Sequence, residues 1–128
     1  MALVLVVDDD PDLLTLVEMQ LRHHGHKVMT ASGGREALAL IEARGAPDVA
    51  VLDIAMPGMN GLDLFKQFRK RAETEHLPAI FLSARVGPDD IKAGTSLGAM
   101  YLTKPYVMSA LLDKIDGALS ARPVASGE

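Results

Sequence analysis

Residues 3–10 of the chain read LVLVVDDD, five consecutive apolar residues followed by three aspartates. A short apolar run rich in β-branched residues is typical of a strand that is covered on both faces, as in a parallel sheet. The run stops at Asp8. Asp10 followed by Pro11 is a typical helix start, because aspartate is a good N-cap and proline suits the first helical position. This stretch therefore predicts a buried strand that ends in carboxylates and leads directly into a helix.

The same alternation continues along the rest of the chain. Further short strands are predicted at residues 27–31, 48–53, 78–83 and 100–103. Helices are predicted from Asp10 to Gly25, from Ser32 to Gly45, through Leu62, Phe65 and Phe68, from Gly87 onward, and through Leu111, Leu112, Ile115 and Leu119. Five β-α units in strict alternation predict an α/β fold, a doubly wound five-stranded parallel sheet with helices on both faces. One domain is expected over residues 1–120, followed by a flexible tail or linker stump at residues 121–128.

The composition excludes several classes of protein. The 128 residues are 48% apolar and 23% charged, as expected for one ordinary globular domain. There is no cysteine, which excludes disulfides, thiolate zinc sites and cysteine nucleophiles. A formal charge of −4, the lack of tryptophan and 4% aromatic residues argue against nucleic-acid binding by this chain. No apolar stretch is long enough to span a bilayer and no basic leader precedes the first strand, so a cytoplasmic protein without membrane contact is expected.

Polar residues follow four of the predicted strands at the point where each strand ends. They are Asp8 and Asp9 after the first strand, Asp53 at the end of the third, Ser83 at the end of the fourth and Lys104 after the fifth. Ligands of open parallel sheets bind beyond the carboxyl ends of the strands, so these side chains are expected to converge there. Crowded carboxylates repel unless a cation intervenes, and ligands that are all oxygen suit Mg²⁺, with Mn²⁺ as the alternative.

A lysine and a serine beside such a cation are the groups that hold the oxygens of a phosphoryl group. Lys104 offers a point charge and Ser83 offers a hydrogen-bond donor. An aspartate among them is a suitable covalent acceptor. The strand ends therefore predict a site for phosphoryl transfer.

Four segments in order carry a resemblance to a known family. They are residues 6–10 (VVDDD), 52–61 (LDIAMPGMNG), 82–85 (LSAR) and 101–105 (YLTKP). In sequence and spacing they resemble the CheY-like receiver domain of bacterial two-component response regulators, from Val4 to about Ser120. The resemblance implies the flavodoxin-like arrangement of the sheet, with strand order 2-1-3-4-5.

The resemblance also implies how the acidic residues act. Asp53 resembles the family's phosphoacceptor, which takes a phosphoryl group from the phosphohistidine of a sensor histidine kinase or phosphotransfer protein. Asp8 and Asp9 resemble the acidic pair that holds Mg²⁺, Asp9 directly and Asp8 largely through water. Asp53 itself and the backbone carbonyl of Ala55 would complete the ligands that the protein gives to the metal.

Three further residues resemble the switching residues of the family. Lys104 matches the lysine that pairs with the acceptor carboxylate and then with the phosphoryl group. Ser83 matches the hydroxyl that moves toward the phosphoryl group, and Tyr101 the aromatic ring that turns inward behind it. The face formed by the fourth helix, fifth strand and fifth helix would then change shape, and a downstream protein or an output domain would bind to it.

Two other functions compete with this interpretation. A phosphatase of the haloacid dehalogenase type also uses a strand-end aspartate, a lysine and Mg²⁺, and Asp8 and Asp10 have the spacing of its first motif. However, Asp12 stands where that motif has threonine or valine, no acidic pair follows Lys104 at a strand end, and the chain leaves no room for a cap domain. The second alternative is a binding module that works without phosphorylation, against which the intact acidic pair, acceptor and lysine argue.

Structural roles are expected for other polar residues. Asp10 and Asp12 suit the cap and first turn of a helix, where negative charge is favourable. The spacing of His23, His24 and His26 is compatible with a metal site, but an exposed helix C-terminus is the preferred interpretation.

Overall fold

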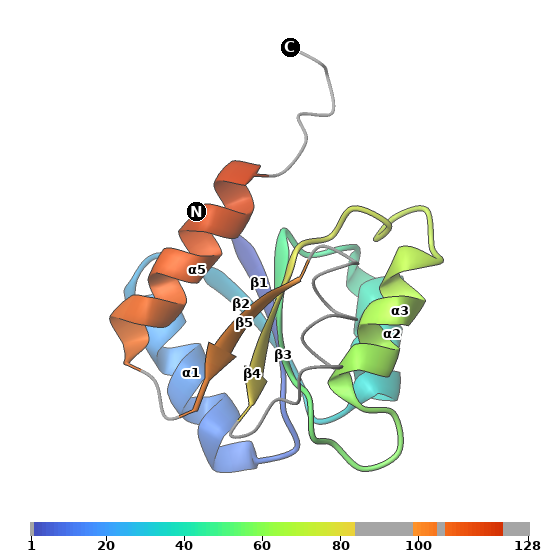
Figure 1. Ribbon diagram of the computed structural model, residues 1–128, viewed down its shortest axis with the longest axis horizontal. Helices are drawn as coiled ribbons and strands as arrows, with labels where there is room; N and C mark the ends of the chain where they lie inside the picture. Colours follow the sequence, from blue (N-terminus) through green and yellow to red (C-terminus); the bar gives the residue numbers. More distant parts are fainter. Residues whose placement is uncertain (1, 84–98, 105–106, 122–128) are drawn as a thin grey trace.

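The computed structural model describes residues 2–83, 99–104 and 107–121, with only the backbone described at Ser83 and Ala121 (Figure 1). The strands are β1 (Leu3–Val7), β2 (Lys27–Ala31), β3 (Val49–Asp53), β4 (Ala79–Ser83) and β5 (Met100–Thr103). The helices are α1 (Pro11–His23), α2 (Gly34–Arg44), α3 (Gly61–Arg69) and α5 (Met108–Ala121). The helix predicted from Gly87 onward and most of the predicted tail lie outside the described residues. No described helix is of a length and hydropathy that would let it span a bilayer.

All five strands are parallel and form one sheet in the order β2-β1-β3-β4-β5. Helices α1 and α5 cover one face of this sheet, and α2 and α3 cover the other (Figure 1). The predicted α/β fold, its parallel strands and the strand order that the resemblance implied are confirmed. Every predicted strand lies within one residue of an observed one.

The apolar strands are buried because both faces of the sheet are covered. Val4 and Val6 face the core beneath α1 and α5, whereas Leu5 and Val7 face the core beneath α2 and α3. All four side chains are at most 2% exposed. Since successive side chains of a strand point to opposite faces, a continuous apolar run is the pattern required here.

Local capping fixes where α1 begins. The Asp10 carboxylate accepts hydrogen bonds from the backbone N–H groups of Asp12 and Leu13, at 3.0 and 3.4 Å. Its own backbone N–H donates to Asp8 Oδ1 at 2.9 Å. The prediction that Asp10 caps the helix is confirmed, and the cap also holds the Asp8 side chain at the strand end.

A glycine and a capping box fix the connection from β3 to α3. The Asn60 side chain accepts a hydrogen bond from the Asp63 N–H, and the Asp63 carboxylate accepts one from the Asn60 N–H. The Gly61 N–H donates to the Ile54 carbonyl at 3.0 Å. A Cβ atom at Gly61 would collide with the Asp53 carbonyl oxygen, so only glycine lets α3 begin this close to the end of β3.

The contact between Gly61 and the backbone of Asp53 predicts an effect on stability. Gly61→Ala is expected to lower the free energy of unfolding by about 1–3 kcal/mol, because the collision is with backbone and the two elements must separate. Urea unfolding followed by circular dichroism measures the change.

Gly117→Ala is the matched control, since its added Cβ would only reach ordinary contact with Met100 Cε at 3.9 Å. Gly117 is exposed inside α5, where alanine is expected to raise the free energy of unfolding by about 0.5–1 kcal/mol. Equal stability of Gly61→Ala and the unmodified chain would contradict the assigned role of Gly61.

Candidate functional site

Three carboxylates meet at the carboxyl edge of the sheet. The strands β1 and β3 are neighbours, and Val7 pairs with Leu52, so Asp8 and Asp53 lie side by side where these strands end. With Asp9 they offer carboxylate oxygens that all lie within 4.8 Å of one another. Asp8 and Asp53 are buried, at 3% and 7% exposure, whereas Asp9 is exposed. The convergence expected from the strand ends is therefore present.

Lys104 brings a positive charge to the buried carboxylates. Its Nζ lies 3.3 Å from Asp8 Oδ2 and 3.6 Å from Asp53 Oδ1. Lys104 follows β5, which is separated from β3 by β4, so its long side chain reaches past the end of β4 to the pair. One ammonium therefore faces two buried carboxylates.

The surroundings of Asp53 make its ionised form unfavourable. Burial raises the pKa of its carboxyl above the ordinary value of 3.8, and the negative charges of Asp8 and Asp9 raise it further. The Lys104 ammonium and a hydrogen bond with the backbone of Ala55 oppose this rise in pKa, but only in part. A further positive charge beside the carboxylates would lower this pKa.

The donor set fits a hard divalent cation. Among the described residues, three carboxylates face the Lys104 ammonium, and the cluster that they form includes no imidazole and no cysteine sulfur. Oxygen ligands of this kind suit Mg²⁺, and a divalent cation would supply further positive charge. Ala55 is exposed two residues beyond Asp53, and its backbone is already tied to the Asp53 carboxylate.

Ser83 and Tyr101, the two residues expected to move during switching, lie on neighbouring strands but in different surroundings. Ser83 is the last residue of β4, the strand next to β3, and its neighbour Leu82 pairs with Asp53. Only the backbone of Ser83 is described. Tyr101 lies in β5, and its half-buried ring packs on Phe81 with 5.2 Å between ring centroids. The tyrosine ring thus packs against the core beneath α2 and α3.

Sequence reasoning missed two interactions that support the site. One is the hydrogen bond from the Asp10 N–H to Asp8, and the other is the close approach of Gly61 to the backbone of Asp53. An aspartate that bonds to the N–H two residues later is a common local pattern, so the spacing of Asp8 and Asp10 contained a signal for the first interaction. The second depends on how α3 packs and has no local signal.

Comparisons with known proteins agree with this geometry. A family model described as the response regulator receiver domain matches residues 4–116. Protein PilH of Pseudomonas aeruginosa is 38% identical over 121 residues, which cover 94% of this chain and 99% of PilH. The transcriptional regulatory protein PrrA of Mycobacterium tuberculosis is 43% identical over 121 residues, which cover 93% of this chain and 50% of PrrA. The structure of chemotaxis protein CheY4 of Vibrio cholerae has a TM-score of 0.86 at 33% identity, with 93% of this chain and 99% of CheY4 covered.

These similarities extend over almost the whole chain. The chain spans nearly all of PilH and half the length of PrrA. The likeness to CheY4 includes the sheet at whose edge the three carboxylates meet. The chain belongs to the family of response regulator receiver domains, the regulatory modules of two-component signalling systems.

Proposed function

We propose that Asp53 accepts a phosphoryl group from the phosphohistidine of a sensor histidine kinase or phosphotransfer protein, and that the modified chain then binds a downstream protein or output domain. The observation that carries this proposal is the position of the Asp53 carboxylate, buried among acidic side chains with Lys104 Nζ 3.6 Å away. A carboxylate in this setting is a nucleophile with a counter-charge already in place. The role is regulatory, because the transfer modifies the protein itself.

The transfer step is a displacement at phosphorus. An Asp53 carboxylate oxygen attacks the phosphorus atom, a P–O bond forms, and the P–N bond to the donor imidazole breaks. The imidazole nitrogen keeps the bonding electron pair and takes up a proton. The product is an acyl phosphate on Asp53, and attack by water on its phosphorus would return the free carboxylate and inorganic phosphate.

The neighbours of Asp53 have separate tasks in this proposal. Asp8, Asp9, Asp53 and the backbone carbonyl of Ala55 would hold Mg²⁺, or Mn²⁺ in its place. The metal, when bound, supplies positive charge to the phosphoryl oxygens. Lys104, already close to Asp53 Oδ1, would pair with a phosphoryl oxygen after transfer.

The response of the fold would pass through β4 and β5. In this proposal the Ser83 hydroxyl moves toward the phosphoryl group, and the Tyr101 ring turns further inward. Tyr101 is suited to this because its ring already packs on Phe81 in the strand next to it. The affected face consists of β5, α5 and the segment between β4 and β5, of which residues 84–98 lie outside the description. The charge of the covalently bound phosphoryl group would thus shift the equilibrium between two conformations of this face.

We further propose that residues 1–120 form the receiver unit and residues 121–128 a tail or linker. The protein is proposed to act in the cytoplasm, where its phosphodonor would act, and without direct contact to nucleic acid or membrane. Its partners would recognise it through protein contacts alone.

The assignment of Asp53 predicts a self-limiting modification. Acetyl phosphate with Mg²⁺ is expected to add one acid- and base-labile phosphoryl group, and Asp53→Asn is expected to abolish this labelling because the amide is not a nucleophile. Mass spectrometry of the intact chain measures the added group. The matched control is Asp12→Asn, which alters an exposed acid in the first turn of α1 and is expected to leave labelling unchanged.

Labelling that survives in Asp53→Asn would remove Asp53 from its assigned role. Sustained hydrolysis of a generic phosphate ester by the unmodified chain, with no labelled protein, would favour a phosphatase instead.

The position of Lys104 predicts that its loss separates phosphorylation from the response. Lys104→Ala is expected to leave Mg²⁺ binding largely intact, because the carboxylates remain, but to prevent the phosphoryl group from changing β5 and α5. Amide chemical shifts measured with and without acetyl phosphate would show large changes in the unmodified chain and small ones in the variant. Equal changes in both proteins would argue against this role of Lys104.

The raised pKa of Asp53 predicts a dependence of stability on pH. The folded chain holds the Asp53 proton more tightly than the unfolded chain does, so protonation of Asp53 favours folding. This contribution to the free energy of unfolding is fully present below pH 3.8 and is lost as the pH rises through the raised pKa. In metal-free buffer, Asp53→Asn is therefore expected to raise the free energy of unfolding at neutral pH. The gain is about 1.4 kcal/mol for each unit by which the pKa of Asp53 in the folded chain exceeds that in the unfolded chain. Well below pH 3.8 the two proteins should be equally stable. Urea unfolding at a series of pH values tests this, and a variant that is less stable at neutral pH would contradict it.

A further inference from the structure

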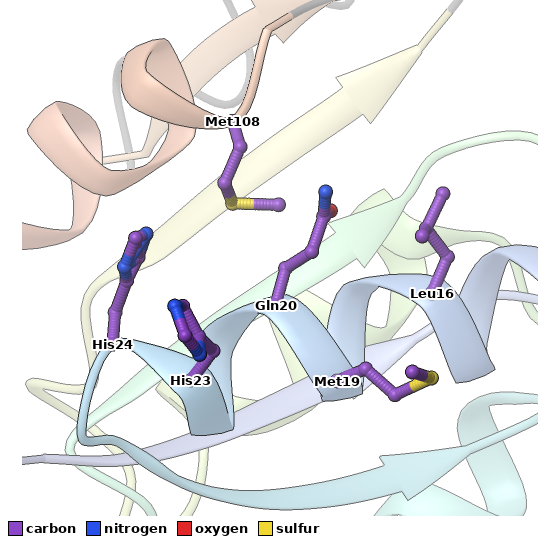
Figure 2. Close-up of a pocket in the computed structure, with 6 residues that line it drawn as sticks. All are labelled: Leu16, Met19, Gln20, His23, His24 and Met108. Carbon is purple, nitrogen blue, oxygen red and sulfur yellow. The ribbon is translucent and has the colours of Figure 1, made fainter.

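A hollow of about 430 Å³ lies between the C-terminal half of α1 and the start of α5. Its lining residues are Leu16, Met19, Gln20, His23, His24 and Met108 (Figure 2). Asp8 lies just before the other end of α1, a helix of 13 residues that is about 20 Å long at 1.5 Å per residue. The hollow is therefore separate from the carboxylate cluster.

Two imidazoles and two thioethers line this hollow. Figure 2 shows the Met108 side chain reaching from α5 toward the part of α1 that carries Gln20, His23 and His24, whereas Met19 extends along α1 away from the two rings. Met108 comes from a different element of the fold, so it lines the same hollow as the histidines only because α5 packs beside α1. The hollow thus combines nitrogen and sulfur ligand atoms.

The spacing of the two rings suits a shared metal ion. The ring centroids of His23 and His24 are 5.5 Å apart, with an interplanar angle of 56°. Two imidazoles that bind one ion through N–metal bonds of about 2.0–2.1 Å have ring centroids about 5–6 Å apart. Within the described part of the chain, neither ring has a hydrogen-bond partner. His26 is not part of this group, because its Nδ1 accepts a hydrogen bond from the Ala2 N–H at 3.4 Å.

The charges around the hollow favour a soft ion over a hard one. None of the described residues that line it carries a carboxylate, and the nearby guanidinium of Arg22 is held by Glu18 at 2.9 Å and by the Val28 carbonyl at 3.0 Å. A thioether ligand favours the soft ion Cu(I), which imidazole also binds, whereas Mg²⁺ prefers the carboxylates at the other end of α1. The two ends of α1 therefore offer opposite ligand chemistry.

We propose that His23, His24 and Met108 form a binding site for a Cu(I) ion that bridges α1 and the start of α5. Leu16 forms its apolar rim, and Met19, which extends along α1 away from the two rings, is not among its ligands (Figure 2). This site is independent of Asp53 and its chemistry, so it stands whether or not Asp53 is phosphorylated. The bound ion would fix α5 against α1, two elements that share the same core.

The test is Cu(I) binding to the full chain, prepared without a histidine tag and kept anaerobic. Competition with a chromogenic Cu(I) chelator is expected to give one ion per chain. NMR spectra should show shifts of the Met108 methyl group and of the rings of His23 and His24, while the signals of Asp53 stay in place. Excess Mg²⁺ is expected to leave Cu(I) affinity unchanged.

Conservative variants separate ligands from lining residues. Met108→Leu keeps the packing but removes the sulfur, and is expected to weaken Cu(I) binding by more than about tenfold, since even the outer partners of metal ligands contribute about 10–100-fold. The double variant His23→Ala with His24→Ala is expected to weaken binding further. Met19→Leu is the matched control and is expected to bind Cu(I) like the unmodified chain.

Three results would overturn the proposal. They are unchanged affinity in Met108→Leu, unchanged affinity in the double histidine variant, and weakening in Met19→Leu that equals that in Met108→Leu. Absence of any binding to the folded, unmodified chain would overturn it as well.

Discussion

The repulsion between two buried carboxylates is the constraint on which the site depends. Asp8 and Asp53 end neighbouring parallel strands, so the sheet forces them together at an edge where little water reaches them. Burial and mutual repulsion raise the pKa of Asp53, and one ammonium, from Lys104, offsets this only in part. Additional positive charge would relieve this repulsion, which explains the fit of the site to a divalent cation.

The fold keeps these charges in place through backbone contacts. The Asp10 N–H holds Asp8, the Ala55 backbone holds the Asp53 carboxylate, and Gly61 lets α3 begin directly against the end of β3. Beneath them, β1 and β3 are buried on both faces, and a close-packed interior leaves them little freedom to move apart. The carboxylates of Asp8 and Asp53 therefore stand at the end of buried strands, while Lys104, which follows β5, reaches them with a side chain that is 24% exposed.

Helix α1 links two regions of different chemistry. Oxygen ligands gather just before its first turn, and nitrogen and sulfur ligands gather at its last turn with Met108. The preferred interpretation of an exposed helix end is confirmed for His23 and His24, since His24 is the C-cap and both are exposed, whereas His26 is half-buried. Exposed histidines can still be the proposed metal ligands, because the hollow between α1 and α5 opens to the surface. Met108 would supply the third ligand of the proposed site.

The sequence by itself determined the strands, the helix start at Asp10 and the set of polar residues at the strand ends. It could do so because buried parallel strands are continuous apolar runs and because caps are local patterns. Strand order came only through the family resemblance, since local periodicity does not say which strands are neighbours. The tertiary structure alone decided the distances from Lys104 to Asp8 and Asp53, the close approach of Gly61, and the hollow that Met108 lines together with His23 and His24. Each joins elements that are distant along the chain or brings backbones into contact, and such contacts are set by packing in three dimensions.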